Sequence, residues 1–456
     1  MQLIDTLIAA RWVIPIEPAG QVLEDHAVAL HQGRIVAVLP EKQARERFSA
    51  ERIVERRSHV LLPGLVNTHT HAAMSLLRGA AGSPSIDHGL HRPVWSLDDR
   101  WLDAEYVRDG AELAIADMLT SGTTCFADMH LFPEATAQAV TSSRIRACIG
   151  LPVLDQPTAW AESANEYLDK GLKLHDEYRA DPLITTMLAP YSAWAVGDNT
   201  LARVRRLADE LELPVTMRIN EAHLEFTASG ERQLARLERL GLLSPLLLAV
   251  HMVHVDASDM ERAAAGGISI AHCPQSNLRL GHGVCPVPAL RTHGIALTLG
   301  TDGTAGNDTL DLFAELRTAA LLASGIRPCI EDSSTEDRPA DSEPDDAPAM
   351  NASDWLQIAT LNGARALGLG DSIGSLVPGK WADLCCIDLA RPQTQPLNDL
   401  AGQIVHAVSR DQVSDVWVAG RELLTRGELT TINLDDVLRR ARLWKQRIGA
   451  QPGVLT

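Results

Sequence analysis

Short apolar runs and amphipathic segments alternate through the middle of the chain. The apolar runs span residues 60–71, 123–129, 214–220 and 246–256, and segments of helical periodicity span 105–122, 199–213 and 230–243. Repeating units of about 20 to 40 residues, each a strand followed by a helix, are typical of a parallel sheet with helical crossovers. The number of units in a chain of 456 residues favours an α/β fold of the (β/α)8 TIM-barrel type over an open sheet.

The two chain ends have a different pattern. Residues 1–60 and 371–456 contain short alternating apolar stretches separated by turn residues, and the latter range closes with a helical segment. Such stretches predict strands. We therefore expect both ends to pair into one small β-sandwich domain beside a barrel formed by residues 61–370, with a C-terminal helix following it.

The segment 327–350 departs from the pattern of the barrel. It is rich in acidic residues and prolines and has few apolar residues. This composition cannot bury enough apolar surface to order a core. We interpret it as a solvated surface insertion of unassigned role.

Composition and charge exclude several classes of partner. The net charge of −18 repels nucleic acid and anionic membrane surfaces. No stretch approaches the roughly 20 apolar residues of a membrane span, and the N-terminus lacks the basic region of a secretion signal. Seven cysteines without a C-x-x-C pair are typical of reduced thiols, so we expect a cytoplasmic protein with a small-molecule substrate.

Polar residues of catalytic type follow several of the apolar runs. His69 and His71 are two residues apart in an extended stretch, so both imidazoles can face one metal ion. Glu221, His251 and Asp302 end three further runs. Taken singly, Asp302 could cap a turn and His251 could be a core histidine. Together they indicate an active site, because barrel enzymes place catalytic residues at the carboxyl ends of their strands.

Several motifs add a resemblance that covers nearly the whole chain. The stretches that carry it are LPGLVNTHTHAAMSLLRG, GTTCFADM, HCPQSNLRLGHGVCPV, LGTDGTAGNDTLDLF, ATLNGARALGL and GSLVPGKWADL. The chain resembles the amidohydrolase superfamily, and within it the branch of 5-methylthioadenosine/S-adenosylhomocysteine deaminases. The resemblance implies hydrolytic deamination of an adenine nucleoside to the inosine analogue and ammonia, by a homo-oligomer.

The resemblance also implies roles for individual residues. One divalent ion would be held by His69, His71, Asp302 and a further histidine, with zinc expected and iron, manganese or nickel possible. Glu221 would transfer protons and contact the substrate, His251 would orient the water, and Asp302 would accept a proton. Tyr191 is a second candidate for substrate binding, because it stands where the family places a substrate-facing histidine.

The sequence departs from the family at the further histidine, where Arg218 stands, and in the loop 80–101. A guanidinium remains protonated and cannot ligate a metal. Three possibilities follow. Metal could bind with Glu221 or His223 completing the site; Arg218 could pair with Asp302 or Glu221 and replace the metal; or a metal-free pocket could bind a ligand against Tyr191 and Trp194. The alternatives to a deaminase are thus an impaired family member acting as a binding or structural protein, and a hydrolase of another heterocycle.

Overall fold

A computed structural model describes residues 1–79, 100–222, 230–325 and 350–449. Most of the loop 80–101, nearly all of the insertion 327–350, and His223 lie outside these residues. Among the described residues, no helix combines the length and the apolar character that a membrane crossing requires.

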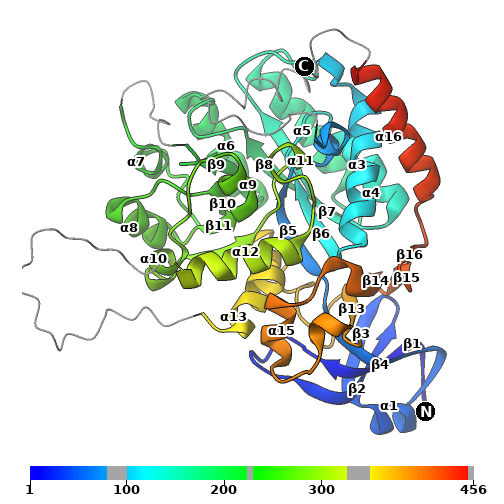
Figure 1. The fold of residues 1–456 in the computed structure, drawn as a ribbon. Helices are drawn as coiled ribbons and strands as arrows, with labels where there is room; N and C mark the ends of the chain where they lie inside the picture. Colours follow the sequence, from blue (N-terminus) through cyan, green and yellow to red (C-terminus); the bar gives the residue numbers. More distant parts are fainter. Residues whose placement is uncertain (80–99, 223–229, 326–349, 450–456) are drawn as a thin grey trace, which may run out of the picture.

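Eight parallel strands form the central barrel (Figure 1). They are β5 (Leu65–Thr70), β6 (Thr123–Asp128), β7 (Arg146–Val153), β8 (Ile184–Pro190), β9 (Val215–Ile219), β10 (Leu247–His251), β11 (Ser269–His272) and β12 (Ala296–Leu299). Each strand pairs with the next in the sequence, and a parallel bridge between Thr70 and Asp302 links the two edges of the sheet. The predicted (β/α)8 barrel is therefore confirmed.

Helices lie between the successive barrel strands. They are α3 (Ala104–Leu119), α4 (Pro133–Ser143), α5 (Ala164–Tyr178), α6 (Asp198–Leu211), α7 (Gln233–Arg239), α8 (Ala257–Gly266), α9 (Pro274–Arg279) and α10 (Val287–Thr292), followed after β12 by α11 (Thr304–Asn307), α12 (Leu312–Gly325), α13 (Ala352–Gln357) and α14 (Gly363–Ala366). Helix α6 shows why these segments cover the sheet. Its buried residues Leu201, Val204 and Ala208 recur at helical spacing, so one face packs on the strands and the other meets solvent.

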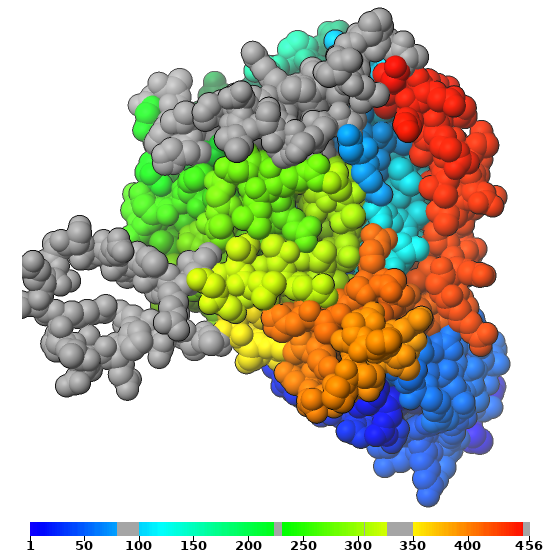
Figure 2. All heavy atoms as spheres, viewed as in Figure 1, coloured from blue at the N-terminus to red at the C-terminus, as the bar shows by residue number. Residues whose placement is uncertain are grey.

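Both chain ends contribute to a second sheet of eight strands, as the sequence predicts. Its order is β16-β15-β14-β13-β4-β1-β2-β3. The strands are β1 (Gln2–Val13), β2 (Leu23–His31), β3 (Arg34–Pro40), β4 (Phe48–Pro63), β13 (Leu384–Asp388), β14 (Val413–Val418), β15 (Arg421–Thr425) and β16 (Glu428–Leu429), with the short helices α1 (Glu41–Arg47) and α15 (Leu400–His406) beside them. In the space-filling view the two ends, blue and orange, form one continuous surface beside the barrel (Figure 2).

The C-terminal helix α16 (Leu434–Gly449) returns to the barrel and packs against α3. The indole of Trp444 donates a hydrogen bond to Asp109 Oδ2 at 2.9 Å. Arg440 forms ion pairs with Asp109 and Glu112. Both contacts join α16 to α3.

Candidate metal and active site

The carboxyl ends of four barrel strands bring the candidate catalytic residues together. His69 lies in β5 and His71 follows that strand directly, while His251 is the last residue of β10. Glu221 and Asp302 follow β9 and β12. His251 and Asp302 have backbone φ angles of 76° and 58°. Positive φ is costly for residues other than glycine and is concentrated at functional sites.

His69, His71 and Asp302 form a compact buried cluster. Their donor atoms all lie within 4.8 Å of one another. Asp302 Oδ1 is 3.6 Å from His69 Nε2 and 3.4 Å from His71 Nε2. His71 Nδ1 lies 2.5 Å from the carbonyl oxygen of Met129, so that contact orients the ring and directs Nε2 toward Asp302.

Electrostatics keep His71 and Asp302 in the protonation states that bind a cation. Burial lowers the pKa of His71 to about 3, so its imidazole is neutral at physiological pH. Although burial alone would raise the pKa of Asp302, its interactions with His69 and His71 hold it well below the ordinary range. Neither ring nitrogen of His69 has a hydrogen-bond partner among the described residues. Two buried imidazoles and one buried carboxylate therefore fit a divalent metal ion.

Two glycines make room for the histidines. A Cβ on Gly300 would approach the Cβ of His69 to 2.8 Å, and one on Gly303 would approach the Cβ of His71 to 3.1 Å. The first distance is shorter than side-chain carbons tolerate, so the segment after β12 can lie against His69 only because residue 300 has no side chain.

Arg218 extends from β9 into the same site. Its Nε donates a hydrogen bond to Glu221 Oε2 at 2.8 Å, and Nη2 contacts the same oxygen. Its Nη1 donates to Tyr191 Oη at 3.1 Å, and the guanidinium carbon lies 5.4 Å from the centre of the tyrosine ring. The side chain is only 12% exposed, so this is a buried, charge-assisted contact.

The charges of Arg218 and Glu221 reinforce each other. Burial would lower the pKa of Arg218, but the charge of Glu221 outweighs it and raises that pKa above the ordinary arginine value. Burial would likewise raise the pKa of Glu221, yet the charge of Arg218 holds it well below its ordinary range. Both groups are therefore ionised at neutral pH.

The second oxygen of Glu221 faces two histidines. Glu221 Oε1 is 3.6 Å from His251 Nε2 and 3.3 Å from His282 Nδ1. His251 is fully buried, and its Nδ1 lies 2.9 Å from Asn277 Oδ1. Burial lowers the pKa of His251 to about 4. Asn277 thus fixes the orientation of the neutral His251 imidazole, which lies between Glu221 and the cluster of His69, His71 and Asp302. The ring centres of His251 and His69 are 5.9 Å apart.

The structure brings together the residues that the sequence offered for the site, with two exceptions, His223 and Trp194. His223 lies outside the described residues. Trp194 is 52% exposed and does not line the pocket described below, so its role as a stacking surface stays a prediction. His282 and Asn277 were not singled out from the sequence. Both lie within the motif HCPQSNLRLGHGVCPV, which was the available signal.

A pocket of about 280 Å³ opens beside Tyr191 and Met129, which contact Arg218 and His71 respectively. It is lined mainly by apolar side chains: Leu102, Met129, Leu131, Pro152, Leu154, Pro157 and Ala189. His130, Gln156, Thr158 and Tyr191 add polar atoms. Because Tyr191 contacts Arg218 and the Met129 carbonyl contacts His71, the pocket adjoins the residues that could carry out catalysis.

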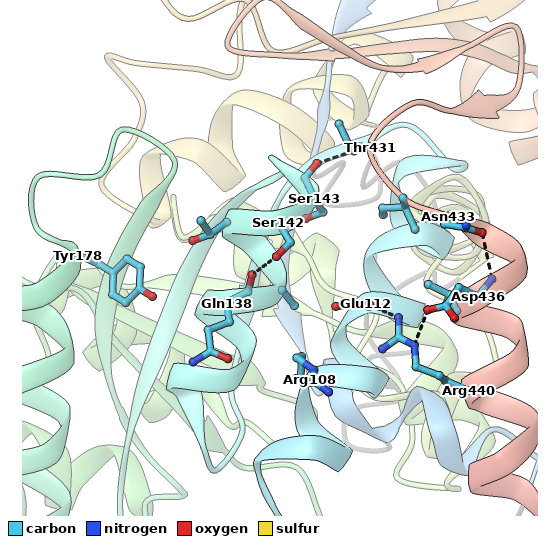
Figure 3. Close-up of a pocket in the computed structure, with 14 residues that line it drawn as sticks. Arg108, Glu112, Gln138, Ser142, Ser143, Tyr178, Thr431, Asn433, Asp436 and Arg440 are labelled. Carbon is cyan, nitrogen blue, oxygen red and sulfur yellow. Dashed lines mark hydrogen bonds and ion pairs between the residues drawn. The ribbon is translucent and has the colours of Figure 1, made fainter.

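A larger hollow, of about 720 Å³, lies on the flank of the barrel between α3, α4 and α16 (Figure 3). Its charged side chains already form ion pairs, Arg108 with the neighbouring Asp109 and Arg440 with Glu112 and Asp436. Arg440 contacts Glu112, and its Nε donates to Asp436 Oδ2 at 2.9 Å. The hollow shares no lining residue with the histidine cluster, so we do not consider it a catalytic site.

A parallel barrel with two histidines and a carboxylate at the carboxyl ends of its strands is the architecture of a metal-dependent hydrolase. The model of the amidohydrolase family matches residues 60–423. The chain belongs to this family and is a hydrolase acting on C–N bonds.

Two relatives match over almost their full length. The 5-methylthioadenosine/S-adenosylhomocysteine deaminase of Teredinibacter turnerae is 40% identical and that of Saccharophagus degradans 37% identical. Each alignment covers 98% of this chain, and it covers 98% and 97% of the respective relatives.

Solved structures give the same fold. An adenosine deaminase from Xanthomonas campestris with bound zinc superposes with a TM-score of 0.92 and 43% identity, covering 99% of this chain and 100% of its own. The atrazine chlorohydrolase of Arthrobacter aurescens TC1, complexed with zinc, has a TM-score of 0.84 at 24% identity, covering 96% and 99%. The latter likeness concerns the fold alone.

Proposed function

We propose that this protein hydrolytically deaminates an adenine nucleoside such as 5-methylthioadenosine or S-adenosylhomocysteine. The products are the corresponding inosine analogue and ammonia. The observation that carries the proposal is the burial of Glu221, His251 and Asp302 at the carboxyl ends of the barrel strands, next to a pocket lined mainly by apolar side chains. The names of the full-length relatives support the substrate class.

His69, His71 and Asp302 are the residues that would hold one divalent ion, and zinc bound in the structure from X. campestris supports that choice of metal. Such an ion acts as a Lewis acid and makes water available as a nucleophile at neutral pH. The charge of Arg218 lies close enough to act on His71 and His251, and its consequence for metal binding is considered below.

Glu221 has the protonation state and position of the general base. Its ionised carboxylate removes a proton from the attacking water and delivers it to the ring nitrogen of the substrate. His251, held through Asn277, directs its Nε2 toward the same region and orients the water. Asp302, also ionised, accepts the second proton of the water and passes it to the amino group, so that the C–N bond breaks and ammonia leaves. The net reaction exchanges the amino group for oxygen and consumes one water.

Replacement of the base tests the proposal. Glu221→Gln removes the proton acceptor, and general acid–base catalysis contributes about 10²- to 10⁴-fold, so kcat should fall by at least that range. Glu238→Gln is the control, because Glu238 is an exposed glutamate paired with Arg262 on the surface. Ammonia release should be measured with 5-methylthioadenosine, S-adenosylhomocysteine and adenosine, and chloride release with a chlorotriazine. Turnover of the last substrate alone would contradict the proposal.

Two further features belong to the proposal as expectations. We expect a homo-oligomer, which size-exclusion chromatography with light scattering would measure directly. We also expect the protein to act in the cytoplasm, where reduced conditions suit its buried free cysteines.

A further inference from the structure

The metal site that supports the proposed function contains a buried cation of its own. Arg218 occupies the position at which the family motif provides a further metal-binding histidine. Its guanidinium does not turn toward solvent. It contacts Glu221 through Nε and Nη2 and Tyr191 through Nη1. A planar fork that satisfies two buried oxygen atoms is a specific arrangement, unlike a long side chain that has swung away.

Arg218 and Tyr191 depart from the family pattern at two positions that touch each other. Tyr191 stands where the family places a histidine facing substrate, and its hydroxyl accepts a hydrogen bond from Arg218. The tyrosine ring also lies 5.4 Å from the guanidinium carbon, within the range of a cation–π contact. The two departures from the family pattern are therefore in direct contact with each other.

The charges of the site explain what these departures do. Asp302 and Glu221 are both buried carboxylates, and Glu221 accepts a hydrogen bond from Arg218 Nε at 2.8 Å. Two buried negative charges without compensation are costly. Arg218 balances one of them in the absence of metal. When a divalent ion enters, the same guanidinium places a further positive charge beside it and repels it.

We propose that Arg218, anchored by Glu221 and Tyr191, is an internal counter-charge that stabilises the metal-free site and weakens metal binding. The inference rests on the proposed function only in identifying the metal site. The ion is held by three protein ligands, His69, His71 and Asp302, and it competes with Arg218 for the negative charge of the site. Zinc occupancy therefore follows the free zinc concentration, and the protein remains folded when zinc is removed.

The test compares zinc affinity and thermal stability in a small set of variants. Zinc affinity is measured by competition with a chromophoric chelator, and melting temperature with and without chelator. Arg218→His removes the charge and supplies a ligand. Changes that merely reorient metal ligands alter affinity about 10- to 100-fold, so Arg218→His should tighten zinc binding by about 100-fold or more. In the presence of chelator, Arg218→His should melt at a lower temperature than wild type. Added zinc should raise the melting temperature of Arg218→His by more than it raises that of wild type.

Two further variants distinguish the effect of the positive charge from that of the added metal ligand, and both from general destabilisation of the fold. Arg218→Lys keeps the positive charge but loses the planar fork, so its zinc affinity should stay closer to that of wild type than to that of Arg218→His. Arg205→His changes an exposed arginine paired with Asp209 and should alter neither quantity. Equal zinc affinity of wild type and Arg218→His would overturn the inference. So would a chelated Arg218→His protein as stable as chelated wild type.

The outcomes also separate this inference from the proposed function. If Arg218→His binds zinc more tightly but no variant releases ammonia from adenine nucleosides, the counter-charge stands and the deaminase proposal fails. If wild type and Arg218→His bind zinc equally and both release ammonia, the deaminase proposal stands and the counter-charge fails.

Discussion

Gly300 and His69 are in direct contact, and the absence of a side chain at Gly300 allows it. A Cβ at position 300 would lie 2.8 Å from the Cβ of His69 and 3.0 Å from Cys273 Sγ. Both neighbours belong to the carboxyl ends of barrel strands. The position of a metal-binding residue therefore depends on a glycine two residues before Asp302.

Gly300→Ala should displace His69 and reduce zinc binding. Overpacking a buried contact costs about 1–3 kcal/mol, so we expect a loss of that size in the free energy of unfolding and a lower zinc content by elemental analysis. Gly325→Ala is the matched control, since nothing lies within 4 Å of a Cβ there. Normal zinc content in Gly300→Ala would show that His69 can move without consequence.

The ion pair between Arg218 and Glu221 should behave as a coupled unit. Removing one partner of a buried pair costs about 3–5 kcal/mol, so Arg218→Leu should be strongly destabilising in urea denaturation of the metal-free protein. Adding Glu221→Gln should recover part of that loss, because no unpaired carboxylate remains. A double-mutant cycle measures the coupling. Strictly additive losses would contradict the ion pair as described.

Arg146 and Asp383 join the barrel to the second sheet. Arg146 Nε donates to Asp383 Oδ2 at 2.7 Å, and both side chains are almost fully buried. Arg146→Met leaves the carboxylate of Asp383 without its partner and should cost about 3–5 kcal/mol. Arg205→Met, at an exposed pair, should cost about 0–1 kcal/mol. Urea denaturation compares them, and similar losses would show that the buried pair has no special role.

The pocket beside Tyr191 should favour an uncharged substituent on the nucleoside. Its described lining residues include neither lysine nor arginine, so the charged end of S-adenosylhomocysteine has no cationic partner among them. We expect a higher kcat/KM for 5-methylthioadenosine than for S-adenosylhomocysteine. A hydrogen bond to a charged group contributes about 1.5–3 kcal/mol, so Leu154→Arg should shift the ratio toward S-adenosylhomocysteine by about tenfold or more.

Leu154→Met serves as the control for that prediction, because a volume-conserving apolar change leaves the charge of the pocket unaltered. The ratio of the two kcat/KM values should then stay near that of wild type. A higher kcat/KM of wild type for S-adenosylhomocysteine would contradict the prediction, and would mean that a cationic side chain outside the described lining residues contacts the substrate.

The sequence predicts the barrel and much of the site because both depend on local pattern. Strand β10 is buried along its whole length and lies within the apolar run 246–256, as expected of a buried parallel strand. His69 and His71 share a side of an extended stretch. The partner of Arg218 was left open between Asp302 and Glu221, since the choice depends on a turn. Asn220, with φ of 50°, bends the chain after β9 and brings Glu221 back to Arg218.

Other features depend on contacts that no local pattern records. Arg146 and Asp383 are 237 positions apart, and only the meeting of barrel and second sheet makes them partners. His282 approaches Glu221 after a loop whose path the motif does not specify. His251 satisfies both interpretations that the sequence left open, because it is fully buried and still faces Glu221.

The most direct test of the proposed function is the release of ammonia from 5-methylthioadenosine as zinc is titrated into chelator-treated protein. Identification of the inosine analogue by mass spectrometry accompanies it. We predict that the product forms, that the rate rises with free zinc until the site fills, and that chelator abolishes it. Absence of product at zinc concentrations where binding is measured directly would contradict the assignment of this chain as a metal-dependent nucleoside deaminase.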